Sequence, residues 1–383
     1  MKKVLIVYGG AKHRGGIYTY LEGIFFGSKN DPEVELSLAT IGNWPLGTSL
    51  EKNGFEVWVA DKNPGGLLSG IKKSREFDAI VTMGLVSNFF GRFWAFWAHK
   101  PLLTVVHSDW RTDYLSSPIK KFIFAVAERL MRFVTKRYIT VSEYLKGRLM
   151  AEGVKQEKIS VIYNGVTQPE ELRGKKYGVS EGKGEENAVF LNKSHNSYSI
   201  SHTPGTVVIG SVGRLHPVKN YQELILAIAD LKKQGQNVRL EIAGDGAEKE
   251  KLEKVIRENG LSKEVRLLGW RKDLNKLRQG WDIYIQPSIT EGFGLAAVEA
   301  MQQGLPVVVT PGGALPELVA DGETGIVATG FGHTDIAQAL EKMISDREKM
   351  AKMAEAGQKF AAENFGIDKW TQETLKEYAK VAK

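Results

Sequence analysis

The chain has 383 residues and no cysteine, which excludes structural disulfides and thiolate metal sites. It also lacks any run of about 18 uninterrupted apolar residues, the length that a membrane-spanning helix needs. A closely spaced Asp-x-Asp pair at the end of a predicted strand, a carboxylate set suited to a catalytic divalent cation, is missing too. Its chemistry is therefore expected not to depend on a bound metal.

The first residues, MKKVLIVYGG, place two lysines before a short apolar run, as a signal peptide does. The run passes into a glycine turn and has no small-residue cleavage site, so we expect a buried first strand instead. The sequence predicts a cytoplasmic protein. Peripheral contact with the inner face of a membrane stays an open alternative.

The net charge of +7 lies entirely in the first half. Residues 1–165 contain 23 Lys and Arg against 15 Asp and Glu, whereas the rest of the chain contains 29 against 30. A basic face there would suit an anionic membrane, a nucleic acid or an acidic acceptor. Nucleic acid is the least favoured partner, because the basic residues are not interleaved with a recognised nucleic-acid-binding module.

Short apolar, β-branched runs recur along the chain, and each leads through a turn into a helical pattern. Such strands alternating with helices indicate parallel sheets covered on both faces, so we predict an α/β chain with two doubly wound domains. The expected limits are an N-terminal domain (1–167), a linker or insertion (168–204), a C-terminal domain (205–363) and a C-terminal helix (364–383). This helix is expected to pack against one or both domains, and packing back on the N-terminal domain is one of these options. The expected strands are residues 2–8, 34–40, 55–60, 77–83, 101–106, 137–141, 159–163, 206–212, 238–244, 264–269, 282–287, 305–310 and 325–328.

The stretch SITEGFGLAAVEAM (288–301) follows a predicted strand, turns at Gly-Phe-Gly and opens a helix. The first amides of a helix have no intrahelical partner and attract anions, and Phe293, Gly294 and Leu295 would supply them. Glu291 precedes the helix and Glu299 lies inside it, so the pair could hold hydroxyls on either side of a diphosphate. The alternative is a capping Glu291 and a surface Glu299.

Two further loops at strand ends carry candidate binding residues. Arg214 and Lys219, in GRLHPVKN, would suit a diphosphate, unless they are solvated surface cations. Gly269, Trp270 and Arg271, in LLGWRKDL, could meet a nucleobase, although a tryptophan there can also belong to the core.

Together, GRLHPVKN, AGDG, LLGW and EGFGLAAVEAMQQGLPVVVT resemble the donor half of the family 4 retaining glycosyltransferases, in that family's order and approximate spacing. The resemblance implies the GT-B fold, with two Rossmann-like domains facing a central cleft. It implies a nucleotide-sugar co-substrate (a UDP-, GDP- or ADP-sugar), no cofactor and no metal. It assigns Glu291 to the transferred sugar, Glu299 to the ribose, and Arg214 and Lys219 to the diphosphate.

The first half fits the resemblance more weakly. Gly15 and Gly16 match the family's glycine pair, where the backbone approaches the donor phosphate, but glycine-rich first turns are common in doubly wound folds. His107, at the end of the strand 101–106, matches a histidine that contacts the transferred sugar, although a histidine at a strand end can also be structural. One departure is Thr167, where the family usually has aspartate.

We therefore predict a metal-independent, retaining glycosyltransferase with Glu291 and His107 as catalytic residues and a sugar, glycolipid or polysaccharide as acceptor. Two alternatives stay open: a nucleotide-sugar epimerase of the same fold and a non-catalytic nucleotide-sugar-binding subunit. The basic, apolar stretch at 118–137 could rest on an anionic membrane, or could be an ordinary helix with a cationic outer face.

Overall fold

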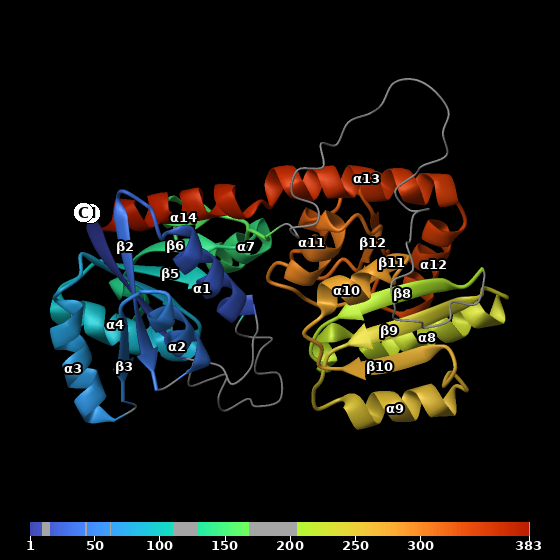
Figure 1. The fold of residues 1–383 in the computed structure, drawn as a ribbon, viewed down its shortest axis with the longest axis horizontal. Helices are drawn as coiled ribbons and strands as arrows, with labels where there is room; N and C mark the ends of the chain where they lie inside the picture. Colours follow the sequence, from blue (N-terminus) through green and yellow to red (C-terminus); the bar gives the residue numbers. More distant parts are fainter. Residues whose placement is uncertain are drawn as a thin grey trace, which may run out of the picture. The chain divides into compact units, whose positions relative to one another are not determined.

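The computed structural model describes residues 1–9, 16–42, 44–61, 63–109, 129, 131–167 and 205–382 (Figure 1). The expected linker (168–204), Gly15 and most of 118–137 lie outside the described residues. The chain divides into two compact units. Unit 1 contains Met1–Thr167 and Phe365–Lys383, and unit 2 contains Gln168–Asn364.

Unit 1 is built on a seven-stranded sheet in the order β3-β2-β1-β4-β5-β6-β7. Its paired strands run parallel, and the last five residues of β1 are buried, as a near-continuous apolar strand predicts. The strands are β1 (Lys2–Tyr8), β2 (Val34–Ile41), β3 (Val57–Ala60), β4 (Ala79–Met83), β5 (Leu102–Val106), β6 (Thr135–Thr140) and β7 (Ile159–Val161). The helices between them include α1 (Gly16–Gly27), α2 (Pro45–Lys52), α3 (Pro64–Ser74), α4 (Leu85–Ala98) and α7 (Glu143–Ala151).

Unit 2 repeats the plan with a six-stranded parallel sheet in the order β10-β9-β8-β11-β12-β13. Its strands are β8 (Val207–Val212), β9 (Val238–Ala243), β10 (Val265–Gly269), β11 (Ile283–Gln286), β12 (Val307–Val309) and β13 (Ile326–Val327). Its helices are α8 (Tyr221–Lys233), α9 (Lys249–Glu258), α10 (Leu274–Gln279), α11 (Leu295–Gln302), α12 (His333–Ile344) and α13 (Arg347–Asn364). Each of the thirteen predicted strands is confirmed.

The strand order reverses beside the first strand of each sheet, between β1 and β4 in unit 1 and between β8 and β11 in unit 2. In open parallel sheets, ligands bind at the carboxyl ends of the strands next to such a switch point. In unit 2 those ends lead into the loops that carry Arg214, Lys219 and Glu291.

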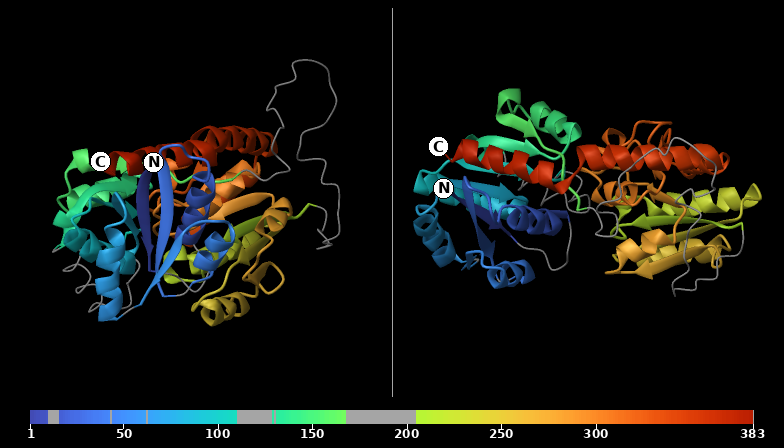
Figure 2. Two further views of the ribbon diagram at one scale, coloured as in Figure 1. Left: turned by 60° about the vertical axis from the view of Figure 1, so that its left-hand side comes forward. Right: turned by 45° about the horizontal axis from the view of Figure 1, so that its top comes forward.

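The last helix, α14 (Ile367–Val381), belongs to unit 1 and packs against α1 (Figure 2). Trp370 of α14 packs so closely on Gly165 that a side chain would not fit there, since an added Cβ would lie 2.7 Å from Trp370 Cβ. Val166 N donates to Phe365 O at 2.9 Å, which ties the two segments together. The predicted apolar positions of this helix are all buried: Trp370, Leu375, Tyr378 and Val381.

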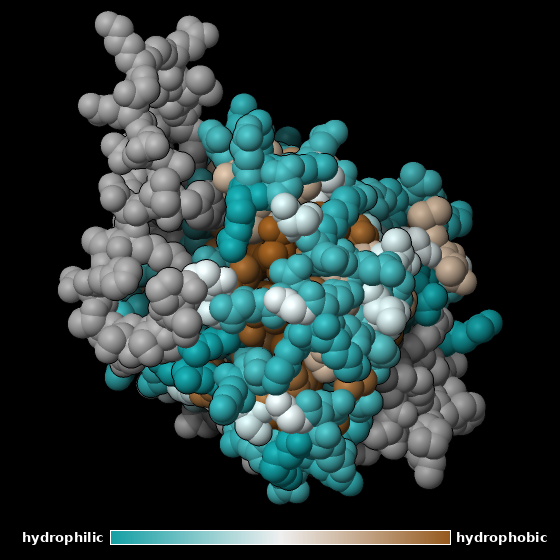
Figure 3. Space-filling view, turned by 90° about the vertical axis from the view of Figure 1, so that its right-hand side faces the viewer, coloured by the Kyte–Doolittle hydropathy of each residue, from teal (hydrophilic) through white to brown (hydrophobic). Residues whose placement is uncertain are grey.

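The surface seen in Figure 3 is mainly hydrophilic, with apolar side chains showing between the polar ones. In the described part of the chain, no helix combines the length and the apolar character that a bilayer crossing requires.

Candidate active site

Three loops at the carboxyl edge of the unit 2 sheet hold one another in place. Ile289 N donates to Val218 O at 2.9 Å, which joins the loop after β11 to the loop after β8. Ala314 N donates to Glu291 O at 3.0 Å, which joins the same loop to the one after β12. Gly313 has φ +66°, and a Cβ there would lie 2.3 Å from Glu291 O. The loop that carries Glu291 is therefore held by the loops on both sides of it, after β8 and after β12.

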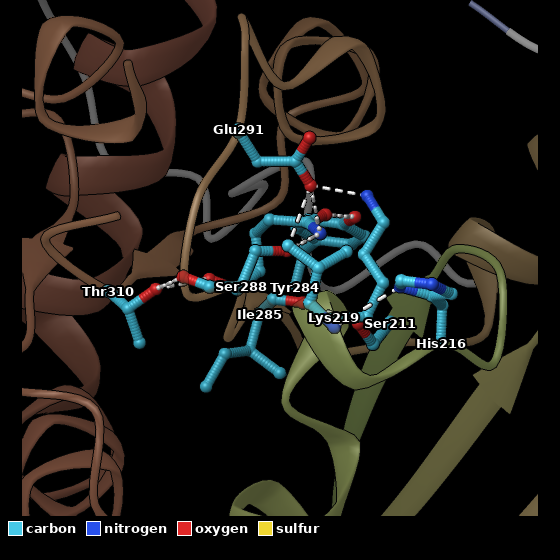
Figure 4. A network of polar contacts seen from close by, with 10 residues as sticks. Ser211, His216, Lys219, Tyr284, Ile285, Ser288, Glu291 and Thr310 are labelled. Atoms are coloured by element: carbon cyan, nitrogen blue, oxygen red, sulfur yellow. Dashed lines mark hydrogen bonds and ion pairs between the residues drawn. The ribbon is translucent and has the colours of Figure 1, made fainter. Parts of the chain in front are cut away.

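The carboxylate of Glu291 forms an ion pair with Lys219 (Figure 4). The same oxygen, Oε1, accepts hydrogen bonds from Ser288 Oγ at 2.8 Å and Gln286 Nε2 at 3.1 Å. The side chains of Lys219 and Glu291 are only 17% and 16% exposed, so both alternatives, a solvated Lys219 and a capping Glu291, are disfavoured. In the described part of the chain every contact of this carboxylate falls on Oε1, which leaves Oε2 for a ligand hydroxyl.

A buried polar chain orients this carboxylate from behind. Tyr284 donates its hydroxyl to Gln286 Oε1 at 2.5 Å, and this turns Gln286 Nε2 toward Ser288 Oγ, at 2.9 Å, and Glu291. Burial raises the pKa of Tyr284 well above its usual value, so it stays a neutral donor. Thr310 Oγ1 donates to Ser288 O at 2.6 Å (Figure 4). Gln286 and Ser288 were not among the predicted site residues, although polar residues at the carboxyl end of an apolar strand could have indicated them.

Arg214 is exposed, and no carboxylate pairs with it in the described ranges of the chain. Its neighbour Gly213 is closely packed, since a Cβ there would lie 2.7 Å from Tyr221 Oη and 3.3 Å from Lys219 Cε. Arg214 thus presents an uncommitted forked cation at the same sheet edge as Lys219.

The glycines of AGDG serve loop packing. A Cβ on Gly244 would lie 1.8 Å from Gly213 O, and one on Gly246 would lie 2.4 Å from Leu215 O. Leu215 N donates to Asp245 O at 3.0 Å. The loop after β9 therefore supports the loop that carries the two cations.

The predicted turn into a helix is observed at Gly294, which has φ +110° and precedes α11. A Cβ there would lie 2.9 Å from the side chains of Leu315 and Leu318, so glycine is required by both backbone and packing. Phe293 is buried, and Leu295 is the first helical residue. The helix therefore begins at the residues that the sequence predicts to supply amides to an anion.

Glu299, in the second turn of α11, pairs with Arg278 of α10. Arg278 is 1% exposed, and its Nη1 donates to Asn275 Oδ1 at 3.3 Å. The side chain of Glu299 is 29% exposed, so a ligand can reach it, and both its predicted ribose contact and the alternative of a surface charge stay predictions. Arg278 was missed by the sequence analysis, because a buried arginine and an exposed one look alike in a short polar helix.

The predicted base-binding group follows β10. Gly269 has φ +68°, and its carbonyl accepts from Gly244 N at 2.8 Å. Trp270 is 54% exposed, so the alternative of core packing is wrong for it. Arg271 forms two hydrogen bonds to Asp273, at 2.8 and 2.6 Å, which lower the pKa of that carboxyl. The ammonium of Lys272 lies over the ring of Trp270, 5.6 Å from its centroid, so a cation already covers one face of this exposed indole.

His107 belongs to unit 1 and follows β5. The ring of Tyr20 packs edge-on against it, with 4.5 Å between centroids, and Tyr20 Oη lies 3.1 Å from Tyr378 Oη of α14. Burial lowers the pKa of His107 to about 3, so its imidazole is neutral at physiological pH. Its Nε2 is buried with no partner among the described residues.

The structure thus brings Lys219 and Glu291 into direct contact, with Arg214 on the same loop as Lys219, while Glu299 is held separately by Arg278. Two other predicted site residues, Gly16 and His107, belong to unit 1, where Gly16 is exposed at the start of α1. Within the described ranges, no group of three or more His, Cys, Asp or Glu could hold a metal ion. The roles predicted for these residues stay predictions.

Two doubly wound parallel-sheet units with this loop set define the GT-B architecture. The model of the Glycosyl transferases group 1 matches residues 195–360, and that of Glycosyltransferase Family 4 matches residues 62–168. The structure of Anabaena Alr3699/HepE in complex with UDP is similar over 99% of this chain and 100% of that one, with a TM-score of 0.81 and 24% identity.

Two relatives extend the comparison. D-inositol 3-phosphate glycosyltransferase of Corynebacterium aurimucosum is 36% identical over 159 residues, which are 39% of this chain and span only 38% of that relative's length. An uncharacterized glycosyltransferase of Methanocaldococcus jannaschii is 28% identical over 314 residues, 81% of this chain and 77% of that one. The chain belongs to the family 4 glycosyltransferases.

Proposed function

We propose that this protein is a retaining, metal-independent glycosyltransferase that moves a sugar from a nucleoside-diphosphate sugar to an acceptor hydroxyl. The observation that carries the proposal is the pairing of Lys219 with Glu291 at the switch point of unit 2, beside the start of α11. A cation, helix amides and a carboxylate meet there, as a diphosphate joined to a sugar requires.

The proposed binding mode follows from the site. Arg214, Lys219 and the amides of Phe293, Gly294 and Leu295 hold the diphosphate and stabilise the charge that develops as it leaves. These fixed positive groups do the work that a divalent cation does elsewhere, which supports metal independence. Glu299 holds the ribose, and Trp270 offers a face to the base.

Retention is proposed through attack on the face from which the diphosphate departs, with the donor phosphate accepting the proton of the acceptor. Glu291 orients the sugar through the oxygen that its protein contacts leave open. His107, neutral because it is buried, would contact the transferred sugar as a hydrogen-bonding group rather than a cation.

The donor class to test first is the UDP-sugars, because Alr3699/HepE was crystallised with UDP and with UDP-glucose. GDP- and ADP-sugars are the comparison set, and the acceptor is proposed to be a sugar, glycolipid or polysaccharide.

The experiment is a thermal-shift panel of UDP-, GDP- and ADP-sugars, followed by product analysis with EDTA present. We expect one donor class to raise the Tm, and transfer to an acceptor to continue in EDTA with the anomeric configuration retained by NMR. Isomerisation of the donor without acceptor would show an epimerase instead. No shift with any nucleotide would show a chain that does not bind donors.

A further inference from the structure

Helix α4 turns a row of apolar side chains to solvent. Val86, Phe89, Phe96 and Trp97 are 44, 48, 46 and 54% exposed. Phe89, Phe96 and Trp97 follow Val86 by 3, 10 and 11 residues, close to one and three helical turns, which puts the four along one side of the helix. Buried residues such as Trp94 occupy its other side, which packs on the core of unit 1. The exposed row therefore lies outside the buried face by which α4 packs on the core of unit 1.

A second segment extends this surface. Phe133, in the short helix η1 (Arg132–Val134), is 72% exposed, and its ring lies 5.9 Å from that of Phe96. Phe96 in turn lies 5.5 Å from Trp97, between centroids. We call Val86, Phe89, Phe96, Trp97 and Phe133 the aromatic patch. Two segments distant in sequence build it, and contiguous exposed apolar surface of this kind marks an interaction site.

The charge around the patch indicates its partner. Residues 79–108, which contain α4, include no Asp or Glu, and Lys100 is partly exposed there, whereas Arg92 is buried and donates to Thr135 Oγ1. Lys136 is exposed, three positions after Phe133, and the nearby Glu152 is neutralised by an ion pair with Arg132. A second copy of this chain would bring the same positive charge and be repelled. Trp and Phe beside cations match an anionic lipid interface, where aromatic rings sit at headgroup level.

We propose that the aromatic patch docks unit 1 on an anionic lipid bilayer, with Phe96, Trp97 and Phe133 entering the interface and the flanking lysines facing the headgroups. The aromatic patch is centred on α4 and shares only Phe133 and its neighbour Lys136 with the stretch at 118–137. The inference does not depend on the proposed donor site.

The test is co-sedimentation of the full chain with vesicles of phosphatidylcholine, with and without about 30% phosphatidylglycerol. We expect binding to the anionic vesicles, weakened by salt, and reduced about 10-fold or more in the double variant Phe96→Ser/Trp97→Ser, because membrane affinity scales with buried apolar area. Phe26→Ser is the matched control, since Phe26 is 40% exposed on α1, outside the patch. Urea unfolding checks that all variants fold alike.

A second variant, Lys100→Glu/Lys136→Glu, leaves the aromatics in place and is expected to remove most of the salt-dependent binding. The inference is overturned if the full chain ignores anionic vesicles, or if the double variant binds as well as Phe26→Ser. It is also overturned if light scattering shows a dimer that the Ser substitutions dissociate, since the patch would then join two copies.

Discussion

Lys219 and Glu291, 72 positions apart in the chain, form an ion pair between the loops that follow β8 and β11. These strands are neighbours in the sheet, so the topology delivers the two side chains to one place. In the proposed reaction they serve different parts of the donor, and a diphosphate must compete with Glu291 for Lys219. The pair therefore keeps both groups positioned before the donor arrives.

Lys219→Met is expected to weaken binding of the preferred nucleoside diphosphate by about 10- to 100-fold, because a charge-assisted contact is worth roughly 1.5–3 kcal/mol. Isothermal titration calorimetry measures it. Lys232→Met is the matched control, since Lys232 pairs with Glu264 at 2.7 Å in the same unit, outside the loops of the site. Equal affinities of the two variants for the nucleoside diphosphate would show that Lys219 does not contact the donor.

Glu291→Gln is expected to separate binding from catalysis. The amide keeps the shape of the side chain but releases Lys219 from its counter-ion, so the affinity for the nucleoside diphosphate should hold or rise. The rate of sugar transfer should fall by about 100-fold or more, as expected when a preorganised charge is lost from an active site. Steady-state kinetics measure the rate of sugar transfer, and calorimetry measures the affinity for the nucleoside diphosphate. An unchanged rate of transfer would exclude a catalytic role for Glu291.

The strands were predictable because continuous apolar runs between turns leave the chain few other folds. The helix start at Gly294 was also predictable, because a Gly-Phe-Gly turn after an apolar strand is a local signal for the beginning of a helix. The contact between Lys219 and Glu291 was not, since it depends on which strands become neighbours. The burial of Arg278 could not be predicted either, because it depends on how α10 packs beside α11. The local sequence LNKLRQ does not distinguish a buried arginine from an exposed one.

Arg278 is expected to act as a positioning residue for Glu299. In Arg278→Met, the carboxylate loses its anchor, so the KM for the donor should rise about 10-fold, equivalent to about 1.4 kcal/mol, while kcat changes little. A nucleoside diphosphate lacking the ribose hydroxyls provides the discriminating readout. The native protein should prefer the ribose form, and the variant should not. The role would be contradicted if Arg278→Met still preferred the ribose form of the nucleoside diphosphate. It would also be contradicted if the higher KM came only from unfolding of the variant.

Gly294→Ala is expected to lower the free energy of unfolding by roughly 2–4 kcal/mol, from backbone strain together with overpacking. Its φ is +110°, and the added Cβ would press on Leu315 and Leu318. Gly235→Ala is the matched control, because Gly235 has φ +82° but nothing within 4 Å of an added Cβ. Urea unfolding of both variants separates strain from collision, and equal losses would mean that the leucines move aside.

His107 is expected to make the protein less stable in acid. Its folded pKa is about 3, whereas an unfolded histidine titrates near 6.5, so the unfolded state binds more protons between these values. Stability should therefore fall as the pH drops below about 6.5, by roughly 3 kcal/mol at pH 4.5 from this group alone. His107→Gln removes that titration and should flatten the decline. His99→Asn, at an exposed histidine with φ 55°, is the control and should keep it. Urea unfolding from pH 7.5 to 4.5 provides the slopes, and parallel curves for His107→Gln and the native protein would show that His107 is not held neutral by burial.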